Sequence, residues 1–147
     1  MKSIPLFQNQ GAPRGATHAF EVSHLDLTEA TVDTAQAVPL ITLGLGFLFE
    51  VVDSQVLEEF EDASDEAFNS TTVSVGVAGS LVAQLAAQEV NANGTVVQAK
   101  QGTGVAAAPT TATAIVANFV PGPDTKALSN LDKGRVRIYA KITDNRA

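Results

Sequence analysis

The sequence predicts an all-β protein, a sandwich or jelly roll of about eight strands. Val and Thr abound among its 147 residues, and their branched side chains suit a pleated sheet. Apolar and polar residues alternate with a period of two in several segments, as they do in half-buried strands. Turn-forming residues separate these segments, and strands do not alternate with long helical patterns. The length suits one domain with a substantial core.

Residues 1–17 are predicted to form an extended N-terminal arm that precedes a sandwich domain of residues 18–147. The arm is rich in Gln, Asn, Gly and Pro, and it has too little apolar content to fold alone. Three large apolar residues nevertheless cluster in it: Ile4, Leu6 and Phe7. We expect these three side chains to dock on a neighbouring subunit; the alternative is a disordered tail.

The first half of the domain is predicted to contain three strands. Residues 18–27 form the first strand, and a slip in their alternation near His24 allows a bulge. Residues 38–45 and 47–52 form the next two strands. We expect these two to pair as a hairpin, because glycines separate them.

Residues 53–69 are the most acidic segment, and the sequence predicts a solvated loop or a single helical turn there. A calcium site is the alternative. The segment lacks the glycine and the D-x-D-x-D spacing that a calcium-binding loop needs, which counts against that alternative.

The second half is predicted to contain the remaining strands. Residues 71–77 alternate valine with small polar residues and form the central strand, whereas residues 81–90 favour a short helix or an irregular strand. Further strands are expected at 95–100, 112–120 and 135–143. The last of these has the clearest alternation, with Arg135, Arg137, Tyr139 and Lys141 facing outward and four residues facing inward: Val136, Ile138, Ala140 and Ile142.

Charge is distributed very unevenly along the chain. Residues 16–98 contain thirteen Asp and Glu residues and no Lys or Arg, whereas residues 100–147 contain seven of the nine basic residues. We expect an acidic and a basic surface that steer association with neighbours; the alternative is a charge asymmetry without a role. The candidate electrostatic contacts are Arg135, Arg137, Lys141, Glu58, Glu59 and Asp62. Nucleic acid is not an expected partner, because the chain is acidic overall.

No motif of a catalytic or cofactor site is present, and we expect neither an enzyme nor a cofactor. The chain has no cysteine, and its only histidines are His18 and His24. On a continuous strand these two would share a face, roughly 20 Å apart, which is too far to bind one metal ion. No apolar run has the length of a membrane span or of a signal-peptide core, so we expect a soluble protein with no membrane partner.

Residues 47–144 resemble small virion proteins of tailed bacteriophages, the head decoration or cement proteins. The resemblance rests on T-V-S-V-G at 72–76, L-A-A-Q-E-V-N at 85–91 followed by Asn-Gly, an Ala/Thr-rich strand, and K-G-R-V-R-I-Y at 133–139. It implies a jelly-roll-like β-sandwich and a mechanical role, but it identifies no site residues.

The resemblance also implies partners and a location. It implies binding to the major capsid protein on the capsid exterior of the virion, and a homo-oligomer, for which we favour a trimer over a dimer. The alternative function is a carbohydrate- or receptor-binding β-sandwich module of a phage tail. The scarcity of aromatic residues, with one Tyr and no Trp, counts against that alternative.

Overall fold

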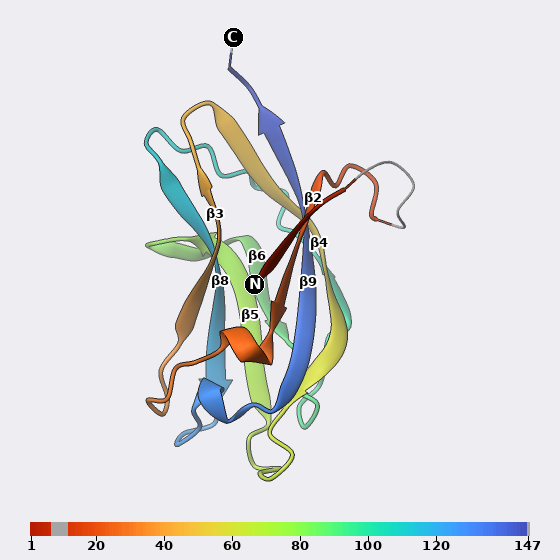
Figure 1. Ribbon diagram of the computed structural model, residues 1–147, viewed down its shortest axis with the longest axis vertical. Coiled ribbons are helices and arrows are strands. Elements are labelled where there is room, and N and C mark those ends of the chain that lie inside the picture. The colour runs from red at the N-terminus through yellow and green to blue at the C-terminus, as the bar shows by residue number, and fades with distance from the viewer. Residues whose placement is uncertain (7–11, 147) are drawn as a thin grey trace.

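The computed structural model describes residues 1–6 and 12–146, and it consists of two antiparallel sheets packed face to face (Figure 1). The first sheet has the strand order β1-β2-β9-β4-β7, and the second has the order β3-β8-β5-β6. The strands are β1 Lys2–Pro5, β2 His18–Ser23, β3 Gln36–Leu43, β4 Phe47–Glu61, β5 Ser70–Val77, β6 Ser80–Glu89, β7 Ala99–Gln101, β8 Thr113–Gly122 and β9 Lys133–Asp144. The predicted all-β sandwich is confirmed.

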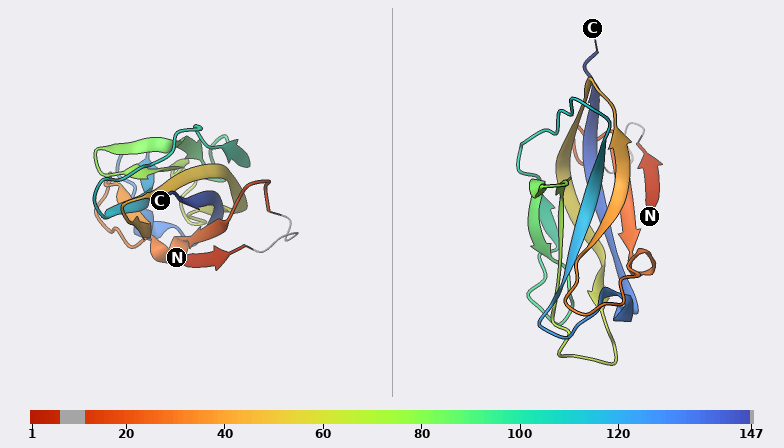
Figure 2. Two further views of the ribbon diagram at one scale, coloured as in Figure 1. Left: turned by 90° about the horizontal axis from the view of Figure 1, so that it is seen from above. Right: turned by 90° about the vertical axis from the view of Figure 1, so that its left-hand side faces the viewer.

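The order of the strands is that of a jelly roll. From β2 onward, each strand lies in the opposite sheet from the one before it, except that β5 and β6 form a hairpin within the second sheet. The two sheets therefore interleave as 2-9-4-7 and 3-8-5-6, the arrangement of an eight-stranded jelly roll. Strand β1 is an addition at the edge of the first sheet, and Figure 2 shows it on one flank of the elongated sandwich.

The core lies between the two sheets and is rich in phenylalanine. The rings of Phe20 and Phe49 approach to 6.2 Å between centroids, and those of Phe60 and Phe119 to 5.7 Å, distances typical of tilted aromatic pairs. All four side chains are fully buried. These rings, with the inward Val, Leu and Ile residues of both sheets, supply most of the apolar burial that stabilises the fold.

The predicted alternation of the last strand is confirmed. Val136, Ile138 and Ala140 of β9 are fully buried in the core, and Ile142 packs against it. Tyr139 lies on the outer side as expected, opposite Ala19 of β2, yet it is only 6% exposed. The outer face of the first sheet is therefore partly covered at this point.

The prediction of a loop or helical turn for residues 53–69 is wrong up to Glu61, because β4 continues to that residue. Its inward side chains include Phe60, which is fully buried, and Val56, which packs against the core. The register against β9 shifts at three places, and each shift interrupts the period-two pattern by which a strand is recognised. The acidic residues are tolerated because Glu58 and Glu61 lie opposite basic residues of β9.

The predicted hairpin of residues 38–45 and 47–52 is also wrong. Strand β3 pairs with β8 in the second sheet, and β4 pairs with β9 and β7 in the first. The glycines between them turn the chain from one sheet to the other, with a φ of 86° at Gly46. Alternation reveals that two segments are strands, but it does not specify their partners.

The segment after β6 closes one open side of the sandwich. Residues 81–90, for which a helix or an irregular strand was predicted, belong to strand β6, which carries register shifts against β5. The expected strand at 95–100 is reduced to the three residues of β7. Around it, Val97 N donates to Glu89 O of β6, and Val56 N of β4 donates to Gln98 O. The chain thus connects the edges of both sheets.

The first strand ends earlier than predicted. Ser23 caps a 3-10 turn at His24–Asp26, where its side chain accepts a hydrogen bond from Leu25 N and Asp26 accepts one from Ser23 N. His24 therefore leaves the strand, and it does not share a strand face with His18. Neither of the two short helical turns in residues 1–6 and 12–146 has the length and apolar character of a membrane span.

Candidate functional site

The two outer faces of the sandwich differ sharply in charge. The four strands of the second sheet contain a single ionisable residue, Glu89 at the end of β6. We call the outward side chains of this sheet the uncharged face: Ala37, Pro39, Thr42, Thr72, Val82, Ala86, Ala114, Val116, Asn118 and Val120. The outer side of the first sheet, the charged face, carries Lys2, Glu21, Glu50, Asp53, Glu58, Arg135, Arg137 and Lys141.

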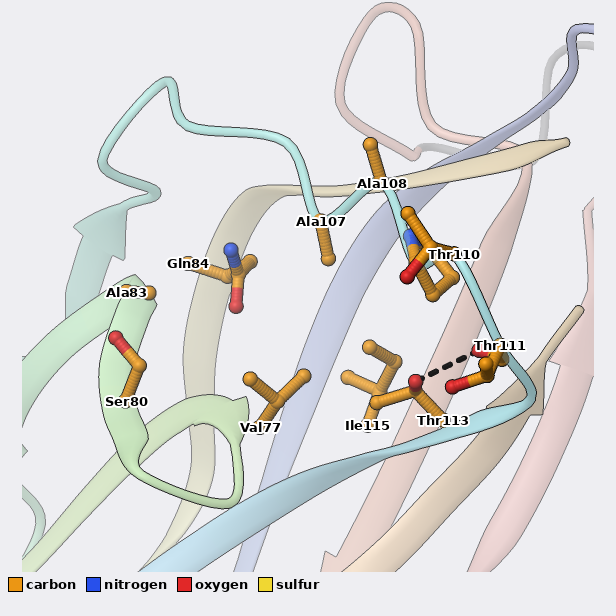
Figure 3. Close-up of a pocket in the computed structure, with 11 residues that line it drawn as sticks. Val77, Ser80, Ala83, Gln84, Ala107, Ala108, Thr110, Thr111, Thr113 and Ile115 are labelled. Carbon is orange, nitrogen blue, oxygen red and sulfur yellow. Dashed lines mark hydrogen bonds between the residues drawn. The ribbon is translucent and has the colours of Figure 1, made fainter. Parts of the chain in front are cut away.

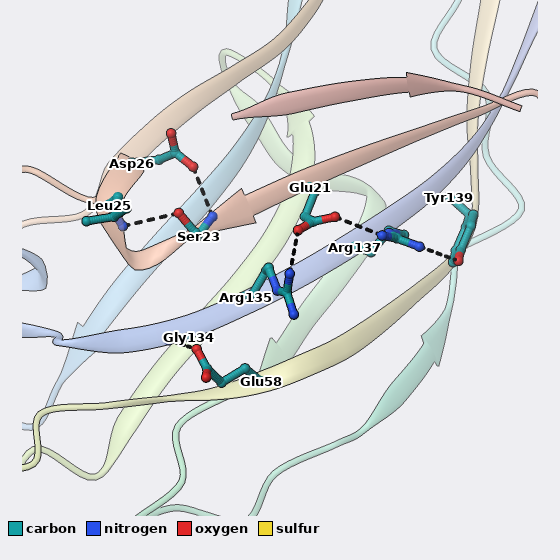
Figure 4. Close-up of polar contacts among 9 residues, drawn as sticks. All are labelled: Glu21, Ser23, Leu25, Asp26, Glu58, Gly134, Arg135, Arg137 and Tyr139. Atoms are coloured by element: carbon teal, nitrogen blue, oxygen red, sulfur yellow. Dashed lines mark hydrogen bonds and ion pairs between the residues drawn. The ribbon is translucent and has the colours of Figure 1, made fainter.

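The charged face is held together by its own ion pairs (Figure 4). Glu21 accepts from Arg137 at 2.8 Å and from Arg135 at 3.2 Å. The hydrogen bond from Arg137 holds the pKa of the Glu21 carboxyl below its ordinary value, against the opposing effect of burial. Glu58 accepts from the backbone N–H of Gly134 at 2.9 Å. Acidic and basic segments that are far apart in the sequence thus lie side by side on one sheet.

The charge segregation of the sequence therefore does not produce separate acidic and basic surfaces. Of the candidate electrostatic contacts, Arg135, Lys141 and Glu58 are exposed on the charged face. Glu59 accepts from Gln98 Nε2 at 2.7 Å. Asp62 is buried and accepts from the N–H and the hydroxyl of Ser64, so it stabilises its own turn. That any of these residues contacts a neighbour stays a prediction.

The arm residues fold back on their own chain where the structure describes them. Strand β1 pairs with β2 and places Ile4 opposite Ala19, and Leu6 N donates to Thr17 O at 3.1 Å. Both apolar side chains are half-buried. Phe7, the third residue of the predicted contact, lies outside the described residues. Docking of these residues on another subunit stays a prediction.

A pocket of about 330 Å³ opens between the β5–β6 turn and the segment that leads into β8 (Figure 3). Val77 and the fully buried Ile115 form its apolar side, together with alanines of the 107–108 segment. Hydroxyl groups line the remainder, from Ser80, Thr110, Thr111 and Thr113. No charged residue lines it.

Gln84 is the distinctive residue of this pocket. It projects from β6 and is only 3% exposed, and Figure 3 shows its amide oxygen on the side of the pocket where Val77 lies. This oxygen has no hydrogen-bond partner within residues 1–6 and 12–146. A buried amide oxygen left without a partner is costly and calls for an explanation.

Sequence reasoning missed this pocket altogether. Its residues come from β5, β6, β8 and the loop before β8, and no local pattern connects them. Gln84 lies in a segment for which a helix or an irregular strand was predicted, so its inward orientation was not foreseeable. A polar residue at an inward position is the only signal the sequence offers, and it becomes visible only once the strand is known.

Within residues 1–6 and 12–146, no three His, Asp or Glu side chains gather as a metal-binding group. His18 stacks beside Phe20 at 6.3 Å and contacts the hydroxyl of Thr17 through Nδ1. The described residues thus define a jelly-roll protein with one charged face, one uncharged face and, beside Gln84, a small uncharged pocket.

Comparison of the chain with known protein families, with curated proteins and with solved structures gave no match.

Proposed function

We propose that this protein is a virion structural protein, a capsid decoration protein that binds the outer surface of a tailed-phage head and stabilises it. The uncharged face carries this proposal. A sheet whose four strands contain a single ionisable residue, Glu89 at the end of β6, has a low cost of desolvation, and depletion of charge is typical of the centres of protein interfaces. The jelly-roll topology, which viral capsid proteins also use, agrees with this role.

The shape of the uncharged face suits a flat partner surface. Its outward residues are mostly Ala, Thr and Val, which are short and lose little side-chain entropy when they are covered. Val82 and Val120 are among its exposed apolar side chains. A stable protein–protein contact buries about 800 Å² of surface on each partner. The outer face of a four-stranded sheet, together with the residues that surround it, offers an area of this size.

A decoration protein can bind each capsid subunit with modest affinity, because it binds many equivalent subunits at once. Burial of exposed valines contributes about 25 cal/mol per Å² of apolar surface before the costs of association. A homo-oligomer that binds several equivalent capsid subunits would multiply this effect through effective concentration. The proposed trimer, placed on the capsid exterior, meets this requirement, with the major capsid protein as the partner.

A coating experiment tests the proposal. Capsids that lack the protein are mixed with the wild type, with Val120→Lys and with Glu50→Gln, and the bound protein is quantified after sedimentation. Val120 is 42% exposed, so the lysine can be accommodated in the fold while its charge disrupts an apolar contact. We expect Val120→Lys to bind at least about tenfold more weakly, and the charged-face control Glu50→Gln to coat normally. Equal coating by all three proteins would contradict a contact through the uncharged face.

The alternative, a carbohydrate- or receptor-binding module of a phage tail, has one observation in its favour. The pocket near Gln84 presents hydroxyl and amide groups, which are suited to bind a neutral polar ligand. No aromatic side chain lines this pocket to stack on a sugar ring. Strong, selective binding on a glycan array would favour this alternative over decoration.

A further inference from the structure

We infer that the pocket beside Gln84 receives one aromatic side chain with an O–H or N–H donor, Tyr or Trp, from a partner protein. The inference goes beyond the proposed function, because it holds for any partner that presents such a side chain. Three properties of the pocket carry it: its volume and apolar side, its lack of charge, and the amide oxygen of Gln84.

The volume and lining of the pocket fit one ring. A pocket of about 330 Å³ is at the small end of the range of ligand sites, which excludes large ligands. Val77 and Ile115 offer the apolar contacts that the faces of a ring require. Aromatic anchors that fill small pockets are the commonest strong contacts in protein interfaces.

The polar groups of the pocket select among the aromatic side chains. No Lys, Arg, Asp or Glu lines it, so a charged group would be desolvated there without a counter-ion. The Oε1 atom of Gln84 is a buried acceptor that has no donor within the described residues. The terminal torsion of Gln is soft, which allows the amide to turn toward an incoming donor. Tyr and Trp supply such a donor, and Phe does not.

The anchor must come from a chain of different sequence. This protein has no Trp, and its single Tyr is Tyr139, which is buried on the charged face. A second copy therefore has no Tyr or Trp at its surface to insert. The pocket borders β8, the strand that also contributes Val116 and Val120 to the uncharged face, so one partner can cover both surfaces.

Small aromatic probes test the inference with the intact protein. Binding of N-acetyl-L-tyrosinamide, N-acetyl-L-phenylalaninamide and N-acetylglucosamine is followed by the NMR signals of Val77 and Ile115. We expect the tyrosine probe to bind with a dissociation constant on the order of 1 mM. One additional hydrogen bond predicts that it binds about 2- to 10-fold more tightly than the phenylalanine probe.

Two variants, with a third as a control, distinguish the contribution of the hydrogen bond from that of the open volume of the pocket. Gln84→Leu should abolish the preference for tyrosine over phenylalanine while it leaves the phenylalanine probe bound. Its melting temperature should be equal to or higher than that of the wild type, since a buried acceptor without a partner is removed. Ala108→Phe, at an exposed position on the pocket lining, should block both probes, whereas Ala106→Phe, exposed in the same loop and outside the lining, should not.

Three results would overturn the inference: no response to either aromatic probe, equal binding of both to the wild type, or a response to N-acetylglucosamine alone. The last would identify a carbohydrate site in place of an anchor site. Capsid coating is measured separately, so a wild-type protein that coats capsids but binds no probe would refute this inference and leave the proposed function standing.

Discussion

Glu21 of β2 and Arg137 of β9 form an ion pair of 2.8 Å across the outer side of the first sheet, although 116 positions separate them in the sequence. The pair joins the acidic first part of the chain to the most basic strand. Charge is thereby collected on one sheet and compensated within it, and the other sheet is left almost without ionisable residues. This division is the basis for assigning the partner contact to the second sheet.

Replacing Glu21 by Gln should lower the free energy of unfolding by about 1–2 kcal/mol at pH 7. The Glu21 side chain is 11% exposed and accepts hydrogen bonds from two arginines. Removal of its charge should therefore lower the stability more than removal of a fully exposed ion pair would. Urea unfolding of both proteins measures the difference. Glu66→Gln, at an exposed position with no ion pair among the described residues, is the control.

The cost of Glu21→Gln should depend on pH. Because the folded protein holds the pKa of Glu21 below its ordinary value of 4.5, the ionised carboxylate stabilises the fold fully above about pH 4.5. This contribution is lost as the pH falls through the lowered pKa. The difference between wild type and variant should therefore be constant from pH 6 to 8 and shrink toward pH 3. A difference that grows on acidification would contradict the assigned ion pair.

Gly134→Ala should destabilise the fold by about 3 kcal/mol. The residue has a φ of 136°, and a Cβ there would overlap the ring of the buried Phe60. Gly79→Ala is the matched control, because its φ of 84° is also unfavourable for alanine but no atom lies within 4 Å of the added Cβ. We expect about 1 kcal/mol for the control. Equal costs by thermal unfolding would mean that β4 and β9 do not pack as closely as described.

Removal of residues 1–11 should leave a folded protein. The truncated chain loses β1 and its pairing with β2, whereas Thr17, which donates to Ala140 O, is retained. If Ile4, Leu6 and Phe7 also contact a neighbouring subunit, the truncated protein should coat capsids more weakly while its circular dichroism remains that of a β protein. Unchanged coating would refute the arm contact, and it would leave the uncharged face as the attachment site.

The sequence predicted the structure well where a strand alternates regularly. It failed where the structure depends on contacts between residues that are far apart in the sequence. Strand β9 was predicted well, because its inward residues from Val136 to Ile142 alternate without interruption. Strand β4 was missed beyond Val52, because three register shifts conceal its period, and because the basic residues of β9 that lie opposite its acidic residues are distant in the sequence. The residues of the candidate sites come together only in the folded chain, as Gln84 and Ile115 do in the pocket.

Electron microscopy of capsids coated with this protein tests the central claim most directly. The reconstruction should show the jelly roll as an oligomer on the outside of the shell, with β3, β8, β5 and β6 turned toward the major capsid protein and the ion pair of Glu21 and Arg137 directed away from it. Density in which the charged face meets the shell, or capsids that stay bare at saturating protein, would contradict the account.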